Sequence, residues 1–411
     1  MRFYIETFGC TANFGNSQEA SEALQEMGHR TSALEEADAV IVNTCAVTER
    51  TERKVLRRLS QLDSERLVVA GCLPSALPSS LSGIRCRGRV GLLGRASAAR
   101  IAEIFQAPTG EPASGIPQGD GLCRVVNIAE GCNGSCSYCI VPRARGGLAS
   151  RRPEEVVEAV RRLVLSGAVE IQLAAQDTAA YGQDIGTALP DLLWPLSGIP
   201  GRFMVRVGMM NPGSASRILD GLLDAMRGPR VYSFLHIPVQ SGSERILEEM
   251  CRGYRADEFI GICRSMREEI PDLYIATDVI VGFPGEEEED FEDTLRLIEA
   301  TMPDKVNVTR YSRRPQTRAA GHYDMPDRIK KERSRMVTRL WLEIAGRRNS
   351  RHIGSEVDVL VTEAGRRGTM KARSANYTEV VIGPCAPGTW QRVLIEGANP
   401  FYLTGTPLPR D

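Results

Sequence analysis

The sequence predicts an α/β protein of three units: an N-terminal parallel α/β sheet, a central partial (β/α)6 barrel and a small C-terminal β-barrel. Three observations support this. Short apolar runs alternate with helical patterns through most of the chain, and one stretch rich in Pro and Gly interrupts that alternation. Near the C-terminus, short strands separated by glycine-containing turns replace it. With 411 residues, the chain is long enough for two or three domains.

In the N-terminal unit, three predicted strands each lead to a cysteine. The strands are expected at residues 3–7, 39–42 and 67–70, with helices at 17–27 and 48–62, and the cysteines that follow the strands are Cys10, Cys45 and Cys72. Because the carboxyl ends of parallel strands share one edge of a sheet, we expect these three thiols to converge. The alternative is that they are ordinary buried cysteines.

A stretch at 107–121 is rich in Pro and Gly and lacks periodicity, which is typical of a linker. The central unit that follows is expected to have strands at 124–128, 170–173, 203–207, 233–237, 274–281 and 305–309, with helices at 153–166 and 286–300 among them. Polar residues stand near the ends of these strands: Gln176, Asp177, Asn211, His236, Gln240 and Asp278. In a barrel this end carries the active site, although each residue alone is also a common helix cap or turn former.

The C-terminal part begins with a basic helix at 327–351, which holds nine Lys or Arg against three acidic residues. Short strands are expected at 357–361, 377–381, 391–395 and 402–405. From residue 327 to the end there are 15 basic and 9 acidic residues, so this part carries about +6 and the remainder about −7, within a net charge of −1. The asymmetry favours an anionic partner.

The residues Cys132, Cys136 and Cys139 form a C-x3-C-x2-C run directly after the first strand of the central unit. Thiolates this close in sequence can hold one metal cluster, and three protein ligands leave one position open for another molecule. A structural zinc site would need a fourth Cys or His nearby, and the next histidine is His236. Eleven cysteines without a paired pattern argue against disulfides, and no apolar run approaches the length of a membrane span, so we expect a soluble, cytoplasmic protein.

This run, with Tyr138 just before its last cysteine, resembles the signature of the radical S-adenosylmethionine (radical SAM) superfamily. The resemblance implies that the three thiolates hold a 4Fe-4S cluster whose open iron binds S-adenosylmethionine, from which one electron produces a 5′-deoxyadenosyl radical. It also makes Gln176 the candidate for the cofactor's ribose and Tyr138 for its adenine, and it places Gln240 in the cofactor cavity. No catalytic side chain is assigned.

Further strings resemble the methylthiotransferase family. They are E-T-F-G-C-T-A-N at 6–13, N-T-C at 43–45, P-V-Q-S-G-S at 238–243 and M-C-R-G-Y at 250–254. The resemblance implies a second, auxiliary 4Fe-4S cluster on Cys10, Cys45 and Cys72. The string R-S-A-N-Y at 373–377 resembles a turn of the TRAM domain, an OB-like barrel that binds RNA. The expected domains are 1–106 with the auxiliary cluster, a linker at 107–121, the radical SAM barrel at 122–326, the helix at 327–350 and a TRAM domain at 351–411.

The family resemblance implies that a methylthio group replaces a hydrogen at an inert carbon. Residues 13–17 and 208–212 look most like the archaeal and eukaryotic branch, which acts on carbon 2 of N6-threonylcarbamoyladenosine beside the tRNA anticodon. N6-isopentenyladenosine in tRNA and an aspartate of a ribosomal protein are the alternative substrates, and an iron–sulfur protein that binds RNA or senses redox state is the alternative without turnover. The expected partners are the tRNA anticodon stem-loop and a reducing donor such as flavodoxin or ferredoxin, with no membrane and a monomeric chain.

Overall fold

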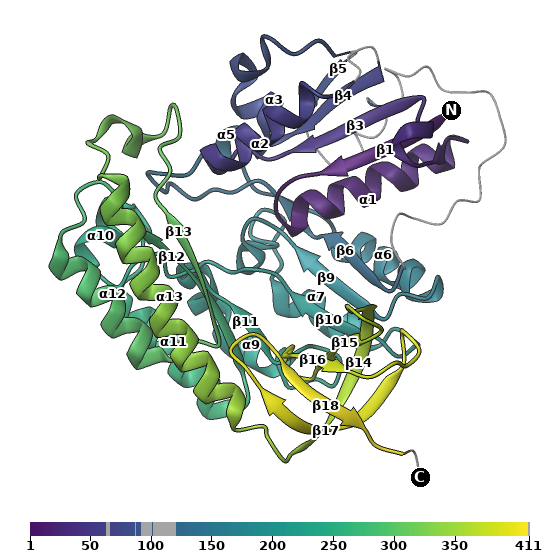
Figure 1. The fold of residues 1–411 in the computed structure, drawn as a ribbon, viewed down its shortest axis with the longest axis vertical. Helices are drawn as coiled ribbons and strands as arrows, with labels where there is room; N and C mark the ends of the chain where they lie inside the picture. The colour runs from purple at the N-terminus through teal and green to yellow at the C-terminus, as the bar shows by residue number, and fades with distance from the viewer. Residues whose placement is uncertain (63–65, 87, 92–100, 102–120, 410–411) are drawn as a thin grey trace.

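The computed structural model describes residues 1–62, 66–86, 88–91, 101 and 121–409 (Figure 1). An N-terminal sheet lies above a central barrel, and a C-terminal barrel lies at its opposite end (Figure 1). Apart from Gly121, the linker expected at 107–121 falls outside the described residues, so the domain boundary there stays a prediction.

The N-terminal sheet is parallel, as expected. Within the described residues its strands stand in the order β2-β1-β3-β4-β5, and they span Arg30–Thr31, Arg2–Thr7, Ala39–Thr44, Leu67–Gly71 and Gly88–Gly91. The helices α1 (Thr11–Glu26), α2 (Glu49–Leu59) and α3 (Cys72–Ala76) follow β1, β3 and β4. Helix α1 begins six residues before the predicted start at residue 17. Asn13, Gly15 and Asn16 are weak helix formers, but buried contacts hold both asparagine side chains in the helix.

All six strands predicted for the central barrel are present. They are β6 (Cys123–Asn127), β9 (Glu170–Ala174), β10 (Met204–Val207), β11 (Phe234–His236), β12 (Tyr274–Val281) and β13 (Lys305–Arg310). Among the described residues they pair in parallel as β6-β9-β10 and β11-β12-β13, and one bridge from Val205 to Val231 lies between the two groups. The outer face is covered by α6 (Pro153–Leu165), α7 (Leu189–Ser197), α9 (Leu219–Met226), α11 (Ala256–Glu269), α12 (Glu288–Thr301) and α13 (Asp327–Ser350). Their apolar faces form the main core of the protein.

The C-terminal barrel is closed, with the strand order β14-β15-β16-β18-β17 in the described chain. The strands span Glu356–Ala364, Met370–Ser374, Glu379–Ile382, Leu403–Pro407 and Trp390–Ala398. The predicted strand at 377–381 begins later than expected, because Tyr377 has a φ of 68° and lies in the turn. The strand β15 was not predicted. No helix in the described part of the chain is both long enough and apolar enough to pass through a membrane.

Helix α13 connects the two barrels (Figure 1). The indole N–H of Trp341 donates to the backbone carbonyl of Asp304 at 2.9 Å, which fixes the helix against the start of β13. The C-terminal barrel then contacts the amino ends of the central strands: Ser233 N donates to Ala375 O at 2.9 Å, and the Tyr377 hydroxyl donates to Glu170 Oε1 at 3.1 Å. The C-terminal barrel therefore closes the end of the central barrel that lies farthest from the carboxyl ends of its strands.

Gly71 shows how tightly the carboxyl edge of the N-terminal sheet is packed. Its φ is 103°, and a Cβ atom placed on it would lie 2.4 Å from the backbone oxygen of Thr44. The neighbouring strand supplies this obstacle, so a side chain at residue 71 cannot turn away without moving β3 from β4.

We expect Gly71→Ala to destabilise the N-terminal sheet by about 2–4 kcal/mol, from backbone strain and the clash with Thr44 together. Thermal denaturation followed by circular dichroism measures the effect. Gly83→Ala is the matched control, because the structure places nothing within 4 Å of a Cβ atom there. Equal melting temperatures for the two variants would contradict this account of the sheet edge.

Candidate functional site

The first group of thiols lies at the carboxyl edge of the N-terminal sheet. Cys10 and Cys72 each place Sγ 3.9 Å from the same oxygen atom, Asn13 Oδ1, so the two sulfur atoms are at most 7.8 Å apart. Cys45 follows β3 between them in the sheet and is buried. Burial raises the pKa of the Cys45 thiol to about 11, and the nearby Cys72 and Cys10 add to this effect. The structure therefore brings together the three thiols that were expected to converge.

The second group of thiols lies in the loop between β7 (Ala129–Glu130) and α5 (Val141–Arg145). The backbone amide of Gly134 donates to Cys132 Sγ at 3.2 Å, and that of Val141 donates to Cys139 Sγ at 3.4 Å. Arg252 donates from Nη1 to Cys136 Sγ at 3.2 Å. Each sulfur thus faces an N–H donor, an arrangement that stabilises thiolates.

The loop can wrap this closely because of Gly131. Its φ is 78°, and a Cβ atom on it would lie 1.9 Å from the backbone oxygen of Gly147. The strands β7 and β8 (Ala149–Ser150) pair at the base of the loop, so the chain entering and the chain leaving it are in direct contact. The cysteines are therefore held by a closed backbone loop.

Arg145 connects the two groups of thiols. It lies in α5, six positions after Cys139, and its side chain is 2% exposed. Its Nη2 donates to Asn13 Oδ1 at 2.6 Å and to Asn16 Oδ1 at 3.0 Å, and its Nη1 lies 3.4 Å from Glu130 Oε1. Asn13 is also the residue beside Cys10 and Cys72. Both thiol groups therefore border one short helix and face the same boundary between the sheet and the barrel.

Each of the two groups offers the three soft thiol donors that an iron–sulfur cluster takes as ligands. Within the described ranges, no three His, Cys, Asp or Glu side chains gather closely enough to hold one metal ion. A cluster binds each thiolate through a different iron atom, so its ligands stand farther apart than those of one zinc ion. Burial also raises the pKa of the Cys139 thiol to about 12, and buried thiols of this kind lose their protons when they bind metal. The residues present therefore fit two iron–sulfur clusters.

The three residues expected around S-adenosylmethionine lie near the second thiol group or at the adjoining strand ends. The Tyr138 hydroxyl accepts from Arg252 Nη1 at 3.4 Å, and the Tyr138 ring contacts Phe283 edge-on at 6.4 Å. Gln176 follows β9, and its buried Oε1 has no hydrogen-bond partner in the described chain. An unsatisfied buried acceptor of this kind suits a hydroxyl donor such as a ribose. Gln240 has a φ of 72° and pairs through its backbone with Asp278 and Ile280.

Several other polar residues have plain structural roles. Asp177 accepts from the amides of Ala179 and Asn211 at 3.2 and 3.0 Å, so it caps a helical turn and ties two loops together. Asn211 caps α8 (Pro212–Ala215) by accepting from Gly213 N at 2.9 Å. His236 Nε2 lies 3.1 Å from Asp278 Oδ1. Sequence reasoning missed Asn13, Arg145 and Arg252 as individual contacts, since only the tertiary structure brings them to the thiols.

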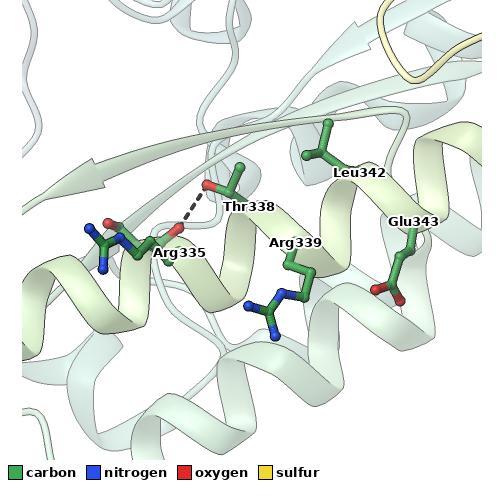
Figure 2. A pocket seen from close by; sticks show the side chains of 6 residues that line it. Arg335, Thr338, Arg339, Leu342 and Glu343 are labelled. Atoms are coloured by element: carbon green, nitrogen blue, oxygen red, sulfur yellow. Dashed lines mark hydrogen bonds between the residues drawn. The ribbon is translucent and has the colours of Figure 1, made fainter.

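Two hollows in the described chain differ in how they are lined. One of about 530 Å³ lies along a single face of α13, where Figure 2 shows Arg335, Thr338, Arg339, Leu342 and Glu343 side by side on one helix. The Thr338 hydroxyl there donates to the backbone of its own helix, at Ser334 O and 2.7 Å. Among the described residues its lining comes from this one helix, so the hollow is an open surface and not a pocket that could enclose a small ligand. The second hollow, about 300 Å³, lies inside the central barrel and is lined by several strands.

Comparison with protein families assigns all three units. Residues 126–298 match the radical SAM superfamily, residues 350–408 match the TRAM domain, and residues 2–86 match a family described as uncharacterized protein family UPF0004. Among solved structures, the chain is similar to the radical S-adenosylmethionine methyltransferase TsrM from Kitasatospora setae, with a TM-score of 0.56 and 15% identity over 78% of this chain and 74% of the other. This likeness supports the fold of the sheet and barrel.

Curated relatives match almost the full chain. A protein of Methanothermobacter thermautotrophicus named probable threonylcarbamoyladenosine tRNA methylthiotransferase is 41% identical over 98% of this chain and 99% of its own. The Drosophila melanogaster protein named threonylcarbamoyladenosine tRNA methylthiotransferase is 34% identical over 98% of this chain and 77% of its own. A tRNA-2-methylthio-N(6)-dimethylallyladenosine synthase of Caldicellulosiruptor saccharolyticus is 34% identical over 93% and 87%. With these relatives and its radical SAM and TRAM units, the chain belongs to the radical SAM tRNA methylthiotransferase family, in the threonylcarbamoyladenosine branch.

Proposed function

We propose that this protein replaces the hydrogen at carbon 2 of N6-threonylcarbamoyladenosine in tRNA, beside the anticodon, with a methylthio group. We assign the radical SAM cluster to Cys132, Cys136 and Cys139, and the auxiliary cluster to the three cysteines of the N-terminal sheet: Cys10, Cys45 and Cys72. The observation that carries the proposal is the position of Arg145, which contacts Asn13 between the first thiols and lies in the helix that follows the second. Sulfur transfer to a carbon radical requires two centres facing one space.

When bound, the clusters and two molecules of S-adenosylmethionine would supply a carbon-centred radical that removes hydrogen, a soft sulfur and the methyl group that this sulfur carries. The chain's own residues bind and orient these groups. Arg252 places a positive charge at Cys136, and Gln176 offers an unsatisfied oxygen for a hydroxyl of the cofactor. Asn13 and Arg145 hold the edge of the N-terminal sheet against the barrel, which excludes water from the space around Cys72.

The choice of substrate follows the comparisons. The relatives named for threonylcarbamoyladenosine reach 41% identity across the full chain, whereas the relative named for dimethylallyladenosine, the same nucleoside as N6-isopentenyladenosine, reaches 34%. We propose that the C-terminal barrel and the basic face of α13 bind the anticodon stem-loop. We further propose that the protein works as a monomer in the cytoplasm and receives electrons from a flavodoxin or ferredoxin. We also propose the domain boundaries predicted from the sequence: 1–106, 107–121, 122–326, 327–350 and 351–411.

The central test is the product. Anaerobically reconstituted protein, given reductant, S-adenosylmethionine and tRNA that carries N6-threonylcarbamoyladenosine, should yield 2-methylthio-N6-threonylcarbamoyladenosine after nuclease digestion and mass analysis. Bulk tRNA from a host that lacks the gene should lose this nucleoside. Unchanged levels in that host would reject the proposed substrate. Failure to form 5′-deoxyadenosine would instead favour an iron–sulfur protein without turnover.

We expect Cys136→Ala to abolish formation of 5′-deoxyadenosine, because a cluster with two remaining ligands cannot hold the cofactor in a fixed position. Liquid chromatography of the quenched reaction measures this product. Cys385→Ala in the C-terminal barrel is the control, since Cys385 packs beside that barrel's core and contacts neither thiol group. Cofactor cleavage that survives in the Cys136 variant would remove this ligand assignment.

Cys45→Ala should distinguish the reaction at one centre from the reaction at the other. We expect it to retain 5′-deoxyadenosine formation but lose the methylthio product, with iron content falling from about eight to about four atoms per chain. Cys86→Ala, also in the N-terminal unit, should retain the full iron content and the product. An unimpaired yield of methylthiolated nucleoside from the Cys45 variant would exclude an auxiliary cluster at this edge.

A further inference from the structure

The hollow inside the central barrel has a distinctive lining. Its volume is about 300 Å³, and its walls come from the inward faces of β10 to β13, from α13 and from the C-terminal barrel. The residues that line it are mostly aromatic or cationic: Arg206, Phe234, His236, Tyr274, Ala276, Lys305, Asn307, Trp341, Arg373, Tyr377, Glu379, Pro400 and Phe401. The cavity is thus the lower part of the barrel interior, with the C-terminal barrel as its floor.

Two of its three Lys or Arg residues have no carboxylate partner in the described chain. Arg373 pairs with Glu379 at 3.1 Å. Lys305 instead places Nζ 4.1 Å from the ring centre of Trp341, and its pKa is lowered by burial. The guanidinium of Arg206 lies 4.7 Å from the ring centre of Phe234 and 5.1 Å from that of Tyr377, and its buried Nε has no hydrogen-bond partner there.

Such an arrangement favours an anion. Aromatic faces attract cations but leave a desolvated charge only partly compensated, and a partly buried ammonium or guanidinium gains most from a carboxylate or phosphate. The cavity holds three Lys or Arg against the one carboxylate of Glu379. A neutral hydrocarbon placed there would leave Lys305 and Arg206 without water and without a counter-charge.

Two residues of the cavity lining contact a polar side chain further along the barrel interior. His236 and Asn307 line the cavity, and both contact Asp278 Oδ1, at 3.1 and 2.7 Å. Asp278 lies two positions further along β12 than Ala276, toward the carboxyl end. Burial opposes the charge on Asp278, but the hydrogen bonds with His236 and Asn307 and the charge of Arg252 together lower the pKa of this carboxyl. Arg252 also donates to Cys136 Sγ. The cavity lining therefore meets Asp278 directly, and the charge of Arg252, which donates to Cys136, acts on the same carboxylate.

We propose that Lys305 and Arg206 bind the carboxylate of the threonylcarbamoyl group of the substrate nucleoside and so select it over nucleosides with neutral N6 groups. The inference rests on the proposed function. In this arrangement carbon 2 of the adenine points toward the cysteines, and the N6 substituent extends along the barrel interior to the cavity. There, the aromatic rings of Phe234 and Tyr377 offer contact to the threonyl methyl group, while the two cations face its carboxylate.

The isopentenyl group carries no charge and would leave both cations without a counter-charge. This cavity therefore discriminates against it. A site built for a charged group rejects an uncharged analogue far more strongly than an apolar site rejects an extra polar atom. An RNA phosphate is the other source of negative charge. A contact to an RNA phosphate would strengthen binding equally for every nucleoside at the modified position. A contact to the threonylcarbamoyl carboxylate would strengthen binding only of the RNA that carries this group.

The test compares the affinities of three anticodon stem-loops for the anaerobically reconstituted protein by fluorescence anisotropy. The stem-loops carry N6-threonylcarbamoyladenosine, N6-isopentenyladenosine or unmodified adenosine. We expect the wild-type protein to bind the first about tenfold or more tightly than the others, as one charge-assisted contact provides. In Lys305→Met and in Arg206→Gln, most of this preference should disappear, while affinity for unmodified RNA changes less than about twofold.

Arg335→Gln on the exposed face of α13 removes the same charge outside the cavity and should affect all three RNAs alike. The proposal is overturned if the wild-type protein shows no preference, if both variants melt like wild type and keep it, or if they weaken all three complexes equally. Product analysis of the wild-type protein keeps the two claims apart. If the wild-type protein forms the product but the variants keep the preference for N6-threonylcarbamoyladenosine, only the carboxylate site is rejected. If the wild-type protein binds this RNA selectively but forms no product, only the proposed reaction is rejected.

Discussion

The buried guanidinium of Arg145 joins the two halves of the site. Its donors reach two asparagine oxygens of α1 and approach the carboxylate of Glu130, all within the boundary between the N-terminal sheet and the central barrel. A buried charge is stable only where partners surround it, so this residue fixes α1 and α5 relative to one another. Each helix begins directly beside a group of cysteines. The relative position of the two thiol groups, on which the proposed pair of clusters depends, is thus set by one cation.

A second constraint is the tight backbone at both thiol groups. Gly71 and Gly131 each stand directly before a cysteine, and each faces the backbone of a neighbouring segment where a side chain would need to lie. Several of these thiols are also desolvated, which raises the pKa of Cys45 and Cys139 and disfavours free thiolates. Closely held, buried thiols are well suited to metal, because a bound metal compensates the negative charge of the thiolates.

The C-terminal barrel also completes the interior of the central barrel. Tyr377 donates to Glu170, and its ring meets Tyr232 edge-on and Phe234 at a tilt, so this domain is packed into the amino end of the central barrel. It closes the barrel interior and contributes walls to the cationic cavity. In the proposed function, the same attachment links the domain that binds the tRNA to the barrel that surrounds the modified nucleoside. Substrate recognition at the stem and at the N6 substituent would then share one rigid support.

The sequence alone determined the architecture and the chemistry of the ligands. Alternation of strands and helices predicted both parallel sheets, since local periodicity reports which face of an element is buried, and the C-x3-C-x2-C spacing indicated a cluster because ligands close in sequence must lie close in space. The strand β15 and the start of α1 were missed, because tertiary contacts overrode weak local preferences there. Only the folded structure decided that Arg145 reaches Asn13, that Arg252 reaches Cys136, and that Lys305 and Arg206 share a cavity. These pairs are distant in sequence, and no pattern along a chain records which distant side chains meet.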